Sequence, residues 1–175
     1  MDPHIVLRVP VEADAEPIFE LVDANRAHLR RWLPWVDGTT SAATVRAFLH
    51  GVLERTAEGT ALEFVIEHDG QLAGLSGFRI LDPTNRIGAL GYWLREDFGG
   101  HGIMTACCRT LVRHGFESLD LNRISLAAAV ENTRSRRVAE RLGFQLEGVL
   151  REAGWLYDHF VDMAVYSILR SEWQK

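Results

Sequence analysis

The spacing of apolar residues in the first third of the chain predicts one strand followed by helices. Residues 5–9 alternate enough between apolar and polar side chains to form a strand. Apolar residues then recur at helical spacing after Asp14, which is a suitable capping residue. A short helix is expected over residues 25–33, because the residue before a proline avoids helical backbone. The next helix is expected to begin at Ser41 or Thr44.

In the middle of the chain the period of the apolar residues changes to that of β-structure. Residues 62–68 and 71–80 flank an Asp-Gly pair, a pattern that favours a β-hairpin. A further strand is expected over residues 86–94. A glycine-rich turn then leads into a helix over about residues 103–116, whose apolar positions recur at helical spacing.

The last third of the chain continues this mixed pattern. Residues 123–130 are strand-like, and residues 133–142 are helical up to Gly143, a usual helix-stop residue. Two strands, 144–151 and 160–169, complete the chain. The order indicates a mixed α/β (α+β) protein with a strand-turn-helix-strand unit at its centre. No Pro/Gly/Ser-rich linker divides the chain, so residues 1–175 are interpreted as a single domain.

Composition narrows the class of protein. The 175 residues are 47% hydrophobic and carry a net charge of −5, so no bulk attraction to nucleic acid is expected. A local basic patch around Arg134, Arg136 and Arg137 stays open. No segment approaches the roughly 18 apolar residues of a membrane span, and the amino terminus does not resemble a secretory signal. Cys107 and Cys108 are adjacent, which suggests reduced core thiols and a cytoplasmic setting.

The glycine-rich turn between the strand at 90–94 and the following helix carries the first candidate chemistry. The start of a helix leaves backbone N–H groups without partners, and glycines let an anion approach the backbone closely. Gly99-Gly100-His101-Gly102 therefore favours a phosphate or pyrophosphate cradle, with a plain tight connection as the alternative. A Walker loop is excluded because Ile103 and Met104 follow Gly102. A dinucleotide fingerprint lacks its third glycine at Thr105, which disfavours a nicotinamide-dependent enzyme.

A second candidate cluster lies at the next strand-to-helix junction. Asn132 can donate and accept hydrogen bonds, and Ser135 offers a hydroxyl on the first helical turn. The alternative is simple helix capping by Asn132 or Thr133. The histidines are scattered and show no paired spacing typical of a metal site.

Taken in order, these motifs resemble the GNAT superfamily of N-acetyltransferases, and within it the RimJ/RimL-like branch. The resemblance covers nearly the whole chain. It rests on Tyr92-Trp93-Leu94, Gly100-His101-Gly102-Ile103-Met104-Thr105, Asn132-Thr133-Arg134-Ser135, Ala139-Glu140-Arg141-Leu142-Gly143-Phe144, Glu147-Gly148 and the stretch from Asn25 to Trp35 with its His-Leu-Arg-Arg-Trp-Leu-Pro-Trp run. It implies a mixed, mostly antiparallel, twisted sheet of about seven strands flanked by helices and splayed open at an acetyl-CoA site.

The resemblance also assigns the residues that bind acetyl-CoA. The backbone of Trp93 and Leu94 would pair with the pantetheine arm, and the glycine turn would hold the pyrophosphate. Ser135 would lie near the thioester sulfur and protonate the departing thiolate. The implied set is Tyr92, Trp93, Leu94, Gly99, Gly100, His101, Gly102, Ile103, Met104, Thr105, Asn132 and Ser135. Asp97 stands where the family has Gln or Arg, so repulsion of the pyrophosphate is expected unless its side chain points away.

On the acceptor side the resemblance implies an amine, most simply the α-amine of a protein amino terminus such as that of a ribosomal protein. Trp35, Trp155 and Tyr157 are the expected substrate residues. Gly154 stands where related enzymes have a carboxylate, so Glu152 or water is the expected proton acceptor. An α-amine, with a pKa of about 7.7–8.0 against about 10.4 for lysine, demands less of a base. Direct transfer is expected, with backbone N–H groups stabilising the oxyanion.

Two other functions stay open from the sequence: acetylation of a small-molecule amine, such as a polyamine or drug, and an acyl-CoA-binding module without catalysis. No membrane partner, no direct nucleic-acid partner and no metal are expected. The oligomeric state stays open, although homodimers are common in this family.

Overall fold

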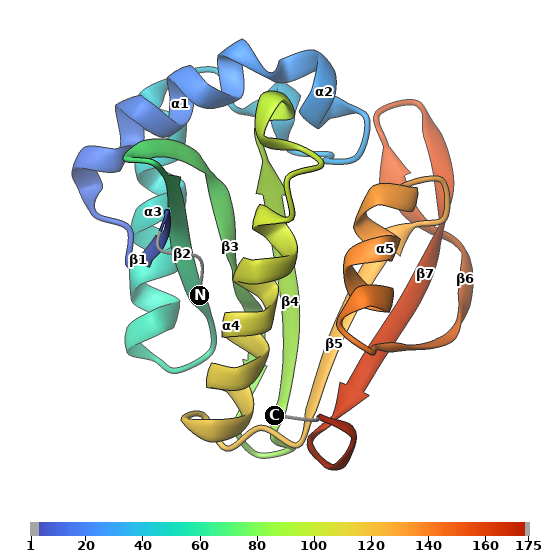
Figure 1. Cartoon of the computed structure of the whole chain (residues 1–175). Helices are drawn as coiled ribbons and strands as arrows, with labels where there is room; N and C mark the ends of the chain where they lie inside the picture. Colours follow the sequence, from blue (N-terminus) through green and yellow to red (C-terminus); the bar gives the residue numbers. More distant parts are fainter. Residues whose placement is uncertain (1–3, 174–175) are drawn as a thin grey trace.

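The computed structural model describes residues 4–173 and builds them around one sheet (Figure 1). The strands are β1 (Ile5–Arg8), β2 (Leu62–His68), β3 (Gln71–Asp82), β4 (Ile87–Leu94), β5 (Arg123–Ala129), β6 (Gln145–Leu156) and β7 (His159–Leu169). Their order in the sheet is β1-β2-β3-β4-β5-β7-β6, and every neighbouring pair is antiparallel except β4 with β5. The expected mixed, mostly antiparallel sheet of seven strands is confirmed.

Five α-helices flank this sheet: α1 (Ala15–Ala24), α2 (Arg26–Arg30), α3 (Ala42–Ala57), α4 (Ile103–Glu117) and α5 (Thr133–Arg141). Short 3₁₀ turns, η1 (Glu12–Asp14), η2 (Val36–Gly38), η3 (Glu96–Phe98) and η4 (Arg170–Glu172), complete the described elements. The short second helix ends three residues earlier than the sequence predicts. No described helix has both the length and the apolar character that crossing a membrane would require.

Both predicted capping residues stand at helix N-termini, but only Ser41 makes a capping hydrogen bond. Ser41 caps α3 by accepting a hydrogen bond from the Thr44 N–H at 3.4 Å. Asp14 stands at the start of α1 but does not cap it. Its carboxylate instead accepts two bonds from the Arg8 guanidinium at 2.7 Å and one from the Val11 N–H. The prediction of a cap at Asp14 is therefore wrong, because a charged partner competes for the same oxygens.

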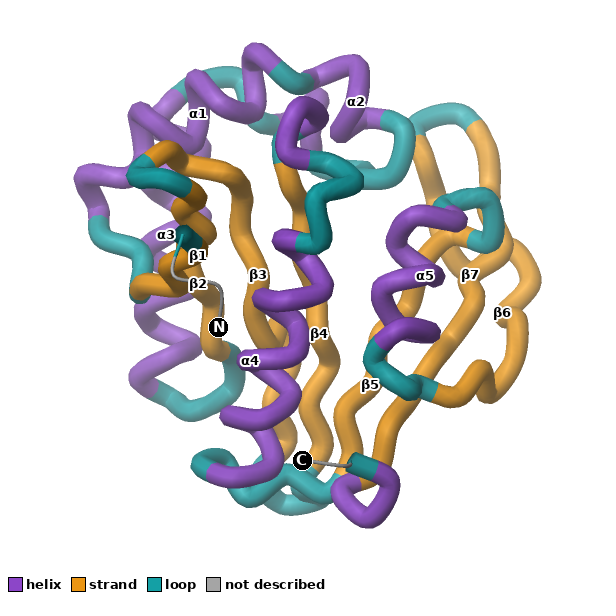
Figure 2. The backbone as a smooth tube through the Cα atoms, in the orientation of Figure 1, coloured by secondary structure: helices purple, strands orange, loops and turns teal. Residues whose placement is uncertain are grey.

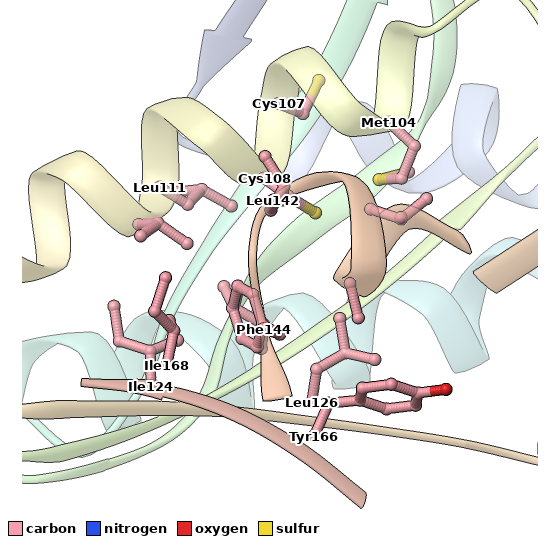
Figure 3. Packing of buried hydrophobic residues seen from close by; sticks show 14 of the residues in the cluster. Met104, Cys107, Cys108, Leu111, Ile124, Leu126, Leu142, Phe144, Tyr166 and Ile168 are labelled. Atoms are coloured by element: carbon pink, nitrogen blue, oxygen red, sulfur yellow. The ribbon is translucent and has the colours of Figure 1, made fainter. Parts of the chain in front are cut away.

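Each face of the sheet has its own core. On one face α1 and α3 pack against the strands through residues such as Val65, Leu75 and Trp93. On the other face α4 and α5 pack against the sheet through a second cluster, which includes Leu126 and Tyr166 (Figure 3). Both cysteines are buried and free, as expected, and burial raises the pKa of Cys107 to about 12.

The sheet opens between its two central strands. β4 pairs with β5 only from Ile87 to Leu90, and beyond that point the two strands diverge (Figures 1 and 2). Each strand stays paired on its far side, β4 with β3 up to Leu94 and β5 with β7 up to Ala129. The divergence therefore leaves the edge of residues 91–94 free to pair with an extended ligand.

Candidate active site

A side-chain hydrogen bond spans this gap. The phenol of Tyr92, on the free part of β4, lies 2.9 Å from the hydroxyl of Ser135 on α5 and donates to the Ser135 carbonyl oxygen at 3.2 Å. Burial raises the pKa of Tyr92 far above its usual value, so the phenol keeps its proton at any physiological pH. The single phenol proton can be donated to the Ser135 carbonyl oxygen or to the Ser135 hydroxyl, and when the hydroxyl accepts it, the serine proton is free to point elsewhere.

A cavity of about 310 Å³ lies on the α4 and α5 side of this contact. Eleven of the twelve residues that the sequence resemblance assigns to acetyl-CoA line this cavity, and His101 does not. The volume is at the lower end of the range for ligand sites, and the cavity is open, as a groove for an elongated molecule must be. The structure thus brings residues 92–105 and 132–135 together around one cavity, whereas the sequence shows only their order along the chain.

The glycine turn has the geometry of an anion site. Gly100 and Gly102 have φ angles of +91° and +80°, which residues with a side chain rarely adopt. Gly102 is the N-cap of α4 and has no side chain to cap it. The Ala106 N–H bonds to the Gly102 carbonyl at 3.0 Å, so the three N–H groups before Ala106 have no acceptor in the helix. These donors and the positive end of a 15-residue helix face the cavity, which suits a phosphate.

Four arginines add positive charge to this cavity, and one histidine also lines it. Arg134, Arg137 and Arg141 line it from one face of α5, where residues three and four apart lie together. That spacing was present in the sequence and could have identified them as site residues. Arg95 lines the cavity from the end of β4, and His28 from α2. Burial is the main reason that the pKa of His28 lies below its usual value, so the imidazole is neutral near pH 7.

Asp97 does not bring its charge into the cavity. Its carboxylate accepts two hydrogen bonds from the Arg95 guanidinium at 2.6 and 2.7 Å, and it is not a lining residue. The hydrogen bonds from Arg95 are the main cause that lowers the pKa of Asp97. The repulsion expected from the sequence is therefore relieved, because the side chain points away from the cavity and is neutralised.

A second cavity, of about 350 Å³, lies on the face of the sheet away from α4. Its strand residues include Ser125 and Ala127, which alternate with the core residues Ile124 and Leu126, and Leu126 also lines the cavity. The two cavities share four lining residues, namely Trp32, Leu33, Tyr92 and Ser135. They meet at the Tyr92–Ser135 contact, so two ligands entering from opposite faces would come together there.

The aromatic residues expected to bind substrate are placed differently from the prediction. Trp35 packs on Trp93 with ring centroids 5.9 Å apart, and Trp155 packs edge-on against Phe160 at 4.7 Å. Neither tryptophan lines a cavity, whereas Trp32 lines both. The sequence alone did not favour Trp32 over Trp35, because these two tryptophans flank the same Leu33-Pro34 pair.

Tyr157 has a supporting position. Its hydroxyl donates to the Leu33 carbonyl oxygen at 2.5 Å, and the Arg30 guanidinium lies 3.8 Å from the centre of its ring. The β6–β7 turn is thereby tied to the segment that carries Trp32. Tyr157 thus holds a wall shared by both cavities, although it does not line either of them.

Glu152 is exposed at a bulge in β6, between Leu150 and Gly154, with a φ of +51°. Its N–H donates to Asp162 at 2.8 Å, and its side chain is not among the residues that line either cavity. A side chain at Gly154 would meet Val161 at 2.9 Å and Met163 at 3.1 Å. Val161 and Met163, the second of which lines the second cavity, thus crowd the place of a Cβ atom at position 154.

Comparison with known proteins agrees with this geometry. A family model described as "Acetyltransferase (GNAT) domain" matches residues 4–145. YdaF of Bacillus subtilis (strain 168) is 38% identical over 98% of this chain and 94% of its own length. The ribosomal-protein-serine acetyltransferase of Escherichia coli (strain K12) is 31% identical over 92% of this chain and 90% of its own length. A structure of RimL, a ribosomal L7/L12 alpha-N-protein acetyltransferase, in complex with coenzyme A superposes with a TM-score of 0.93 at 30% identity, covering 96% and 95% of the two chains.

The fold and the two cavities are those of an acyltransferase that brings a coenzyme A thioester and an acceptor together across a split sheet. The chain belongs to the GNAT acetyltransferase family. It is an N-acetyltransferase, and acetyl-CoA is its co-substrate. The function and fold implied by the sequence resemblance are therefore confirmed.

Proposed function

We propose that this enzyme acetylates the α-amine of a protein amino terminus, with a ribosomal protein as the first candidate, by direct transfer. One observation carries the proposal. Among residues 4–173, neither cavity is lined by an aspartate or a glutamate. An acceptor that loses its proton easily suits such a site best.

The cost of deprotonation separates the two kinds of protein amine. At pH 7 it is about 1–1.4 kcal/mol for an α-amine with a pKa of about 7.7–8.0, and about 4.6 kcal/mol for a lysine with a pKa of about 10.4. A site without a carboxylate base therefore favours an α-amine by roughly 3 kcal/mol, with water as the proton acceptor. The ribosomal-protein names of the relatives support the same class of acceptor.

The first cavity fits acetyl-CoA. Backbone N–H groups at the start of α4 and the arginines of α5 suit a pyrophosphate, and the free edge of Trp93 and Leu94 suits an extended amide chain. The thioester would then lie at the Tyr92–Ser135 contact, where the amine arrives from the second cavity.

Ser135 would act as the general acid. As the amine nitrogen bonds to the acetyl carbon and the carbon–sulfur bond breaks, the Ser135 hydroxyl gives its proton to the leaving thiolate. The phenol of Tyr92, 2.9 Å away, stabilises the developing negative charge on the serine oxygen. The proton lost by the amine goes to water and restores the hydroxyl. No covalent intermediate with the enzyme forms.

The test compares two peptides of the same sequence with acetyl-CoA at pH 7. One has a free amino terminus and no lysine, and the other has a blocked amino terminus and one lysine. We expect kcat/KM to be at least tenfold higher for the free amino terminus, and a doubly blocked peptide to give no thiol release. Equal or faster acetylation of the lysine peptide contradicts the proposal. Binding of acetyl-CoA without thiol release from any amine would favour a binding module instead.

A further inference from the structure

Arg79 has an unusual position in β3. The pairing of β3 with β4 shifts by one residue between Phe78 and Ile80, so Arg79 is the extra residue of a β-bulge. Phe78 points into the core on the α4 side, while Ile80 is 62% exposed and lines the second cavity. Bulges re-aim side chains and are common beside active sites. This bulge places Arg79 at the wall of the second cavity.

Two neighbours hold Arg79 in that place. A Cβ atom on Gly91 would lie 2.3 Å from the Cδ and Nε atoms of Arg79, so the arginine lies flat over β4 only because residue 91 is glycine. The carboxylate of Glu63, on β2, lies 3.9 Å from the Nε atom of Arg79. Arg79 is thus packed against the strand that carries Tyr92, the next residue after Gly91.

The charge of Arg79 is only partly balanced. The Glu63 side chain is 5% exposed, and its burial raises the pKa of this carboxyl group. A carboxylate 3.9 Å away is beyond hydrogen-bond distance, so the guanidinium, which is 43% exposed, is free to bind another one. Among the described residues, Arg79 is the one charged side chain that lines the second cavity.

We propose that Arg79 is a specificity residue that binds a carboxylate of the acceptor, so that the preferred acceptors are peptides with an acidic side chain in their first few residues. This proposal rests on the proposed function and narrows its substrate class. A planar guanidinium matches a carboxylate with two parallel hydrogen bonds. The same charge repels acceptors that carry further positive charges, which disfavours polyamines and amino termini rich in lysine or arginine.

The experiment uses two series of peptides, each with an acidic, a neutral or a basic residue at position 3. One series has a free amino terminus, and the other has a blocked amino terminus and a single acceptor lysine. For the wild-type enzyme we expect kcat/KM to be about tenfold higher for the acidic than for the neutral peptide, mainly through KM. The basic peptide and spermidine should be poorer still. Arg79→Ala should abolish this order, Arg79→Lys should keep part of it, and Arg79→Glu should reverse it.

Arg46→Ala is the matched control, because Arg46 is 45% exposed, also has a carboxylate partner, Glu12 at 3.2 Å, and lies on α3 away from both cavities. It should keep the wild-type order, and all variants should keep the KM for acetyl-CoA. Two results would overturn the inference. One is an equal kcat/KM of the wild-type enzyme for the acidic, neutral and basic peptides, and the other is an equal fall of kcat/KM for all three peptides in Arg79→Ala. Preference for the lysine series instead contradicts the α-amine proposal, and the order of charges within that series still tests Arg79.

Discussion

Replacing Ser135 by alanine tests the reaction chemistry with little disturbance of the fold. The phenol of Tyr92 has two partners on Ser135, the hydroxyl at 2.9 Å and the carbonyl oxygen at 3.2 Å. In Ser135→Ala the carbonyl remains, so the buried phenol is not left without an acceptor. The free energy of unfolding should therefore fall by less than about 1 kcal/mol.

The expected effect on catalysis is much larger. Loss of a general acid costs about 10²–10⁴-fold in rate, which corresponds to about 2.7–5.4 kcal/mol in the activation barrier. Tyr92→Phe keeps the acid and loses one hydrogen bond of about 0.5–1.5 kcal/mol, so kcat should fall only about two- to twelvefold. The double variant should be no slower than Ser135→Ala, since Tyr92 acts through Ser135. Thiol release at saturating acetyl-CoA and peptide measures kcat, and the KM for acetyl-CoA should change little.

The control is Thr133→Ala, two residues away on the same helix, where the side chain is exposed and lines neither cavity. It should keep the wild-type kcat. An unchanged kcat in Ser135→Ala would remove the serine from the mechanism. A larger loss in Tyr92→Phe than in Ser135→Ala would assign the proton to the phenol instead.

Two further predictions concern the turn and the fold. Gly102→Ala must place a side chain at φ +80° with no atom within 4 Å, so it should cost about 1–2 kcal/mol through the backbone alone and raise the KM for acetyl-CoA. Gly59→Ala, at φ +72° with equal space, should cost as much in thermal unfolding and leave that KM unchanged. The hydrogen bonds from Arg8 are the main cause that lowers the pKa of buried Asp14. Its stabilising effect is therefore complete above the unfolded pKa of about 3.9 and is lost as the pH falls through the folded value. Urea unfolding between pH 6 and 2 should show a steeper loss for the wild type than for Asp14→Asn, and equal slopes would contradict this account.

The acetyl-CoA side of the site could be predicted because its parts are local in sequence. A strand, a glycine turn and a helix start form one continuous segment. The first turn of any helix has unpaired N–H donors, so this part of the site does not depend on the rest of the fold. Asn132 and Ser135 also belong to one strand-to-helix junction, and the Asn132 side chain accepts the Ser135 N–H at 3.2 Å. The capping alternative and the functional alternative are thus both compatible with the same residue.

The acceptor side could not be predicted in the same way, because several distant segments build it. Arg79 reaches the second cavity through a bulge, and a one-residue shift in strand pairing leaves no signature in the apolar pattern. Another bulge, in β6, carries Glu152 to the surface. Trp35 and Trp32 are three residues apart, and only the end of α2 decides which of them reaches the cavities. Register and helix ends are properties of the folded chain.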